Sequence, residues 1–282
     1  MKRSLFMLGV AVAALSSCSN NEVLDIAESN AIKFSNTFVG KPTRGVTAPE
    51  LTTDNLKEMY VFASNEDGQV FDDNPKLVYR IGETNEWGYD NLVAWEASKN
   101  YNFVAYAGKD LGESVTDNGD NTSLKFSGIV VNGDKDNQFD LLYSNTVERS
   151  PATADGNPTI DFTFNHLLSM VQFTLKSGFG VTTKVKITNF KFYGVKTTGS
   201  YDASQESPAW TSSVANNGSD TDFKSDGEET AQYDKTTPTD VVNSWVVIPQ
   251  KNTDSENVEM VTFTVNVVDG ELKKYLRPKF HP

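Results

Sequence analysis

Few side chains in this sequence could carry out chemistry. The chain has one cysteine, Cys18, and two histidines, His166 and His281. A lone thiol can be acylated, but it cannot form a disulfide within the chain. Two histidines without a further cysteine argue against a zinc site, and a serine nucleophile would need one of them as its base. The sequence around each residue therefore decides its role.

Neither histidine has a catalytic setting. His281 is the second-last residue, and His166 lies in "FTFNHLLSMVQFTL", between residues typical of a core. We predict that His166 is structural and bonds to the backbone. The chain has no G-x-S-x-G motif and no glycine-rich phosphate loop. We therefore predict a protein that is not an enzyme, with no catalytic residue, no cofactor and no metal.

One acidic stretch partly matches a calcium loop. In "NGDKDNQFDLLY", Asn132, Asp134 and Asp136 occupy the first three ligand positions of an EF-hand. Asn137 replaces the required glycine at position six, and Tyr143 replaces the glutamate at position twelve. A solvated turn is the favoured interpretation, and a weak ion site is the alternative.

Exposed tryptophans could form a platform for sugar rings. The four tryptophans are spread widely, and Trp245 in the apolar run "WVVIPQ" is predicted to be core. Trp87, in the polar stretch "NEWGYDN", is the one expected to be exposed. It is the candidate glycan contact, against the simpler interpretation of scattered core aromatics.

The residues around Cys18 predict lipid attachment. Lys2 and Arg3 precede an apolar run from Leu5 to Leu15, which has the length of a signal peptide and is too short to span a membrane. Leu15-Ser16-Ser17-Cys18 resembles a bacterial lipobox, in which a signal peptidase cuts before the cysteine. Residues 1–17 would then be removed and Cys18 would carry lipid. The alternative is an ordinary signal peptide with an incidental cysteine.

Charge and composition exclude several classes of protein. The formal net charge is −13, and loss of Lys2 and Arg3 with the leader takes it to −15. This charge argues against binding to nucleic acid or direct adsorption to anionic lipid. Aromatic residues make up 11% of the chain, which is too many for a disordered protein. The mature chain is long enough for two domains.

Alternation of apolar and polar residues dominates and predicts an all-β fold. Clusters of Gly, Asn, Asp and Ser separate the segments and are typical of turns. The polar stretch 19–30 is expected to be a tether, and Glu148–Pro158 a linker between domains. The expected strands are Ile32–Val39, Met59–Ala63, Leu77–Ile81, Tyr101–Ala107, Thr159–Phe164, Met170–Lys176, Lys184–Thr188, Lys191–Val195, Ser244–Ile248 and Val258–Val268.

Several segments taken together resemble the Bacteroides-type fimbrillin family, whose members are often lipoproteins. They are the lipobox, "IKF…TRG", "YNFVAYAG", "FDLLYSN", "FTFNHLLSMVQFTL", "FKFYGVKTTGSY" and "SWVVIPQ". The resemblance implies two tandem β-sandwich domains, transthyretin-like or immunoglobulin-like, after the signal peptide and tether. We assign 45–157 to the N-terminal domain and 158–282 to the C-terminal domain.

The resemblance also implies a maturation step. An arginine-specific protease would cut between Arg44 and Gly45, in the exposed stretch "KPTRG". Residues 18–44 would be lost, and with them the strand of Ile32, Phe34 and Phe38. The gap would accept a strand from the next subunit by donor-strand exchange. The alternative is that Arg44 is an ordinary exposed arginine.

These implications define the expected partners and location. The partners are other fimbrial subunits, the two processing peptidases and the outer membrane through lipid, with no nucleic acid. The protein is expected on the cell surface as a lipid-anchored precursor, and in a fimbria after maturation, as a structural subunit or accessory adhesin. The alternative function is a surface glycan-binding lipoprotein that does not polymerise.

The end of the chain departs from the family pattern. "ELKKYLRPKFHP" carries four basic residues and two prolines, which make a poor apolar donor strand. Three interpretations stay open at this point: a truncated C-terminal domain, a divergent one, or a subunit that accepts a strand and donates none.

Overall fold

The chain folds almost entirely as β-strands, which confirms the all-β prediction. A computed structural model describes residues 30–40, 50–134, 137–151, 158–173, 185–192, 195–213, 223–225, 244–250, 261–267 and 273–276. The described part of the chain contains no α-helix, and its short 3₁₀ turns include η2 (Gly112–Ser114). The strands are β1 (Lys33–Val39), β2 (Glu58–Asn65), β3 (Gly68–Gln69), β4 (Lys76–Arg80), β5 (Trp87–Gly88), β6 (Tyr101–Ala107), β7 (Val115–Asp117), β8 (Leu124–Val130), β9 (Leu142–Ser144), β10 (Val147–Arg149), β11 (Thr159–His166), β12 (Ser169–Gln172), β13 (Val185–Phe192), β14 (Thr198–Asp202), β15 (Trp210–Ser213), β16 (Phe223–Ser225), β17 (Ser244–Val247), β18 (Val261–Val267) and β19 (Lys273–Leu276).

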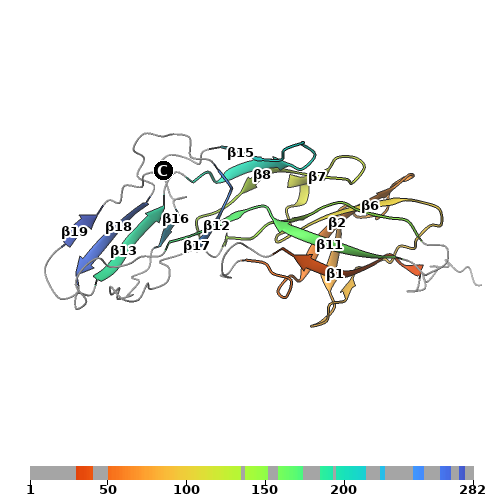
Figure 1. The fold of residues 1–282 in the computed structure, drawn as a ribbon, viewed down its shortest axis with the longest axis horizontal. Helices are drawn as coiled ribbons and strands as arrows, with labels where there is room; N and C mark the ends of the chain where they lie inside the picture. Colours follow the sequence, from red (N-terminus) through yellow and green to blue (C-terminus); the bar gives the residue numbers. More distant parts are fainter. Residues whose placement is uncertain are drawn as a thin grey trace, which may run out of the picture.

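The largest sheet closes on itself as a barrel. Its order is β10-β6-β9-β11-β1-β5-β4-β2-β3, and a further pairing of β6 with β2 completes the ring. Figure 1 shows these strands toward one end of an elongated molecule, with β13, β16, β18 and β19 toward the other. Closure removes most of the exposed sheet edges that would otherwise pair with other chains.

The first strand joins this barrel in an unusual direction. β1 runs parallel to β11, with partners from Lys33↔Thr159 to Val39↔Phe164. On its other side β1 meets β5 antiparallel, at the single pair Phe34↔Trp87. The other strand pairs in the barrel are antiparallel, and parallel pairing is slightly less stable per residue.

Two hydrophobic clusters fill the described part of the molecule. One lies inside the barrel and includes Ile32, Phe34, Phe103 and Phe162. The other lies outside the barrel, where Tyr106 of β6 packs in the same cluster as residues of β8, β13 and β17. β6 is therefore buried on both faces, which explains why "YNFVAYA" is nearly continuously apolar.

The second cluster joins sequence segments from both halves of the chain. β8 pairs with β14 in the four-stranded sheet β15-β14-β8-β7. The side-chain amide of Gln138 both accepts from the N–H of Val246 (2.9 Å) and donates to its carbonyl (3.1 Å), as a neighbouring strand would. β11, which starts at Thr159, belongs to the barrel. The division at residues 157 and 158 therefore does not separate two independent sheets.

Most of the strands expected from alternation are present, but their assembly differs from the expected one. The two segments expected around Lys184–Thr188 and Lys191–Val195 form one strand, β13, interrupted by a register shift between Thr188 and Lys191. The two tandem sandwiches are not confirmed, because the large sheet closes into a barrel and the remaining strands form three smaller sheets. No helix in the described ranges is long and apolar enough to cross a bilayer.

Candidate functional site: the first strand and the ends of the segment that carries Arg44

The space that β1 occupies between β11 and β5, here called the β1 site, is the centre of the candidate functional site. Ile32 is 0% exposed and Phe34 is 3% exposed, as expected for residues of the strand that would be removed. Phe38, the third residue named for that strand, also lies in β1, but it is 47% exposed and points away from the core. Thr37 and Val39 point inward in its place, at 6% and 4% exposure.

A β-bulge explains the position of Phe38. Ser35 pairs with Asp161 and Phe38 pairs with Thr163, so β1 has one more residue than β11 between these pairs. The backbone absorbs the extra residue at Asn36, which has a left-handed φ of +44°. The insertion shifts the alternation by one residue and sends Phe38 to the outer face.

Phe34 anchors β1 through aromatic contacts. Its ring lies 5.7 Å from that of Tyr89 and 6.3 Å from that of Phe103, both edge-on, and it stacks on Phe162 at 6.1 Å. Edge-on and offset stacked arrangements are the favoured geometries of aromatic pairs. The centre of the β1 site is thus shaped for a flat ring.

In addition to the pairing of β1 with β11, hydrogen bonds hold the residues at both ends of β1. At the start, the N–H of Ile32 donates to the carbonyl of Val93 (2.8 Å), and the hydroxyl of Tyr89 donates to the carbonyl of Ile32 (3.0 Å). At the end, the N–H of Gly40 donates to the carbonyl of Phe164 (2.8 Å). In the middle, β5 contributes one residue pair only.

A buried carboxylate binds the backbone just after the segment with the predicted cleavage position. Arg44 and Gly45 themselves lie outside the described residues, between Gly40 and Glu50. Asp140 is 5% exposed, and its Oδ2 accepts from the N–H of Leu51 at 2.9 Å. The same oxygen lies 2.8 Å from Nδ1 of His166, at the end of β11. Asp140 therefore connects the end of β11 to the backbone of Leu51.

The ring of His166 pairs with the carboxylate of Asp140. The backbone of Gly40, the kind of partner that we expected, also acts on it. The hydrogen bond to Asp140 raises the pKa of His166, and the negative charges of Asp140 and Glu50 act in the same direction, against partial burial, which lowers it. The charged imidazolium is thus favoured beside Asp140.

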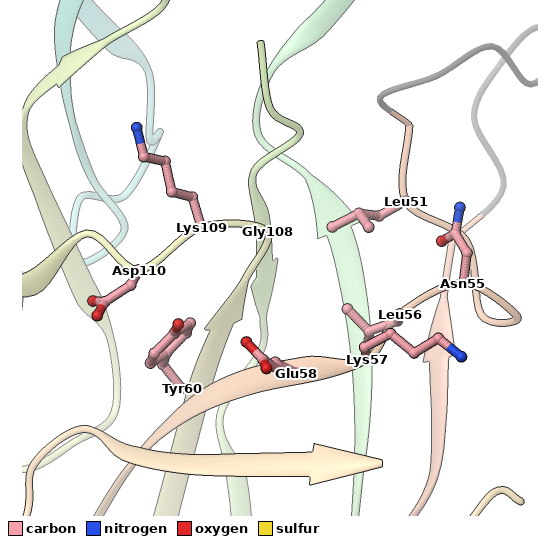
Figure 2. Close-up of a pocket in the computed structure, with 9 residues that line it drawn as sticks. All are labelled: Leu51, Asn55, Leu56, Lys57, Glu58, Tyr60, Gly108, Lys109 and Asp110. Atoms are coloured by element: carbon pink, nitrogen blue, oxygen red, sulfur yellow. The ribbon is translucent and has the colours of Figure 1, made fainter. Parts of the chain in front are cut away.

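A cavity of about 220 Å³ lies next to Leu51. Figure 2 shows Lys57, Glu58 and Tyr60 on one side and Lys109 and Asp110 on the other. Partial burial, with the charges of Asp110 and Glu58, raises the pKa of Tyr60. The lining mixes both signs of charge and contains no nucleophile paired with a base.

Trp87 does not form the exposed platform that its polar neighbours suggested. It is 7% exposed and belongs to the barrel core, opposite Phe34. The guanidinium carbon of Arg80 lies 5.2 Å from its ring. Trp245 is 0% exposed, which confirms its predicted core position. The glycan-binding alternative thus loses the residue on which it depended.

The structure describes only some of the other candidate residues, which are Cys18 and the acidic turn from Asn132 to Asn137. Cys18 lies outside the described residues, and so does Asp136. In the acidic turn, the side chain of Asn132 accepts from the N–H of Asp134 (2.9 Å), and the amide of Asn137 donates to the carboxylate of Asp134 (2.8 Å). These are the bonds of a self-capped turn. Among the described residues, no group of three or more His, Cys, Asp or Glu could hold a metal ion.

Comparison with known proteins decides the family. A fimbrillin-like family model matches residues 43–278, most of the chain. The chain belongs to the fimbrillin-like family. Among solved structures, this fimbrillin-like chain is similar to a putative cell adhesion protein from Bacteroides ovatus ATCC 8483, at 13% identity and a TM-score of 0.47, over 87% of this chain and 85% of that one. It is also similar to a fimbrial protein from the same organism, at 12% identity and a TM-score of 0.41, over 87% of this chain but 46% of that one.

No curated protein matches the sequence. Membership of the fimbrillin-like family supports a fimbrial or adhesin role at the cell surface. It agrees with the resemblance found in the sequence. The sequence alone pointed to β1 and to the segment after it, but it missed Asp140, Tyr89 and Thr37. Asp140 lies in the family-like segment "FDLLYSN", but no local sequence pattern predicts its pairing with His166.

Proposed function

We propose that this protein is a fimbrial structural subunit or accessory adhesin, made as a lipoprotein precursor anchored through Cys18. A protease cut after Arg44 would separate β1 from the rest of the chain. A strand of a neighbouring subunit would then replace β1 in the β1 site. Head-to-tail contacts of this kind do not close on themselves, so they build a filament.

The position of β1 carries this proposal. β1 is the first described strand, it follows the predicted lipid anchor, and it precedes the predicted cut. It is also part of the barrel core, although it pairs with β5 at a single residue. One cut in the segment after Gly40 would thus free a strand that completes the barrel.

The energetics favour refilling of the site. Ile32, Phe34 and Val39 are nearly fully buried. Full burial of a large apolar side chain contributes roughly 1.5–3 kcal/mol, so the three together contribute roughly 5–9 kcal/mol. Loss of β1 would expose the opposing apolar walls and the backbone edge of β11. An open edge with apolar pockets beside it is a site of strand addition.

The test uses an arginine-specific protease on the purified mature chain. The expected products are a new N-terminus at Gly45 and polymers that are seen by size-exclusion chromatography and electron microscopy. Arg44→Ala is the matched control, and it should stay uncut at this position and monomeric. A parent protein that is cut at Arg44 and remains monomeric would contradict the proposal.

A further inference from the structure

We propose that β1 fits the β1 site imperfectly, and that the site prefers a partner strand without a bulge. The inward-facing side chains of that strand would be, in order, aliphatic, aromatic, small and aliphatic. This inference rests on the proposed function in one respect, that the partner strand comes from a neighbouring subunit.

The imperfection is the bulge at Asn36. β11 is the neighbour of β1 in the sheet, and its inward-facing residues alternate regularly, without a bulge. They are Ile160, Phe162 and Phe164. β1 places Phe34, Thr37 and Val39 on its inward face, so its spacing is three residues and then two. The mismatch leaves an unpaired residue and a left-handed backbone at Asn36. Such a conformation is strained for a residue other than glycine.

Removal of the extra residue would restore the match with β11. Without Asn36, the order after Phe34 becomes Ser35, Thr37, Phe38 and Val39. Every side chain would keep its present face, because Ser35 and Phe38 already point outward and Thr37 and Val39 inward. A regular strand can therefore fill the same inward positions as β1 without the strain.

The inward positions define the chemistry of the preferred strand. At the first, Ile32 is fully buried, and its N–H and carbonyl are both hydrogen-bonded, which fixes the register. At the second, three rings surround Phe34 and call for an aromatic side chain. Thr37 and Val39 mark a small and an aliphatic position. The partner strand thus reads aliphatic-x-aromatic-x-small-x-aliphatic.

The first test is made within the full chain. Deletion of Asn36 should raise the melting temperature of the uncut protein by roughly 3 °C, through loss of the bulge. It should also slow polymerisation after the Arg44 cut about tenfold, because β1 then holds its site better. Asn36→Gly is the control: it relieves the strained backbone but keeps the bulge and the register, so it should give a smaller gain. A deletion variant no more stable than the parent would overturn the inference.

The second test presents strands in trans. Fluorescent peptides AIKFSNTFVG (residues 31–40) and AIKFSTFVG (the same without Asn36) are added to the chain cut after Arg44, and binding is followed by anisotropy. The regular peptide should bind about tenfold more tightly, which corresponds to about 1.4 kcal/mol. A third peptide with Phe34→Ala should lose at least that much. Equal binding of the parent and regular peptides would overturn the inference.

The two tests separate this inference from the proposed function. If the cut chain stays monomeric and binds no peptide, strand exchange fails as a function. In that case the melting temperatures of the uncut variants still decide whether β1 is an imperfect occupant. If the cut parent polymerises but deletion of Asn36 changes neither stability nor rate, the proposed function stands and this inference falls.

Discussion

The contrast between Phe34 and Phe38 gives the sharpest prediction from the structure. Both are phenylalanines of one strand, four residues apart, yet one is 3% exposed among three aromatic rings and the other is 47% exposed. Truncation of a buried phenylalanine to alanine costs about 3–5 kcal/mol, through lost burial and the cavity left behind. A surface substitution usually changes stability by less than about 0.5 kcal/mol.

The expected shifts follow from these magnitudes. In a chain of this size each kcal/mol moves the melting temperature by about 2–4 °C, so Phe34→Ala should lower it by roughly 6–20 °C. Phe38→Ala should move it by no more than about 2 °C. The measurement is thermal unfolding of the uncut chain by circular dichroism. Similar losses for the two variants, or a larger loss for Phe38→Ala, would refute the bulged register of β1.

Three further predictions concern the surroundings of the β1 site and the anchor. Gly108→Ala should lower the stability of the chain by more than about 3 kcal/mol, because φ is +119° and the added Cβ would lie 1.8 Å from the carbonyl oxygen of Asp140. Gly119→Ala is the control, because φ is +94° but nothing lies within 4 Å of the added Cβ, so it should lower the free energy of unfolding by only about 1–2 kcal/mol. Both variants are measured by urea titration. The raised pKa of His166, caused first by its bond to Asp140, stabilises the fold fully below the unfolded pKa of about 6.5 and loses this effect as pH rises through the higher folded pKa. Urea midpoints should therefore fall from mildly acidic to alkaline pH in the parent, and a His166→Gln variant with the same fall would refute this assignment. Cys18→Ala should abolish labelling with radioactive fatty acid in growing cells, and labelling that persists would exclude Cys18 as the lipid site.

Alternation along the sequence was sufficient to predict most of the longer strands. Tyr101–Ala107 and Thr159–Phe164 carry clear apolar patterns, and both form barrel strands, β6 and β11. β5 has only two residues, Trp87 and Gly88, and offers no pattern long enough to detect. The parallel pairing of β1 with β11 joins segments more than a hundred residues apart. Turn residues in the sequence predict pairing only between consecutive strands, so they could not predict this one.

The errors within the candidate site have local physical causes. Phe38 was named only as part of the removable strand, and the extra residue at Asn36, which turns Phe38 outward, has no signal in the sequence. The polar neighbours of Trp87 suggested exposure, but β5 lies in the closed barrel with this ring on the inner side. His166 was expected to bond to the backbone, and its partner Asp140 could be identified only from the fold. Cys18, Arg44 and Gly45 remain predictions, because they lie outside the described residues.

The mass of the subunits in assembled polymers is the direct test of strand exchange at the β1 site. Polymers formed after protease treatment are dissociated, and each subunit is measured by intact-mass spectrometry. We expect subunits that begin at Gly45 and lack residues 31–40, since β1 must leave the β1 site before a partner strand can enter it. Polymers whose subunits retain the β1 segment, either covalently attached or as a bound fragment in equal amount, would show that assembly does not proceed by strand exchange at the β1 site.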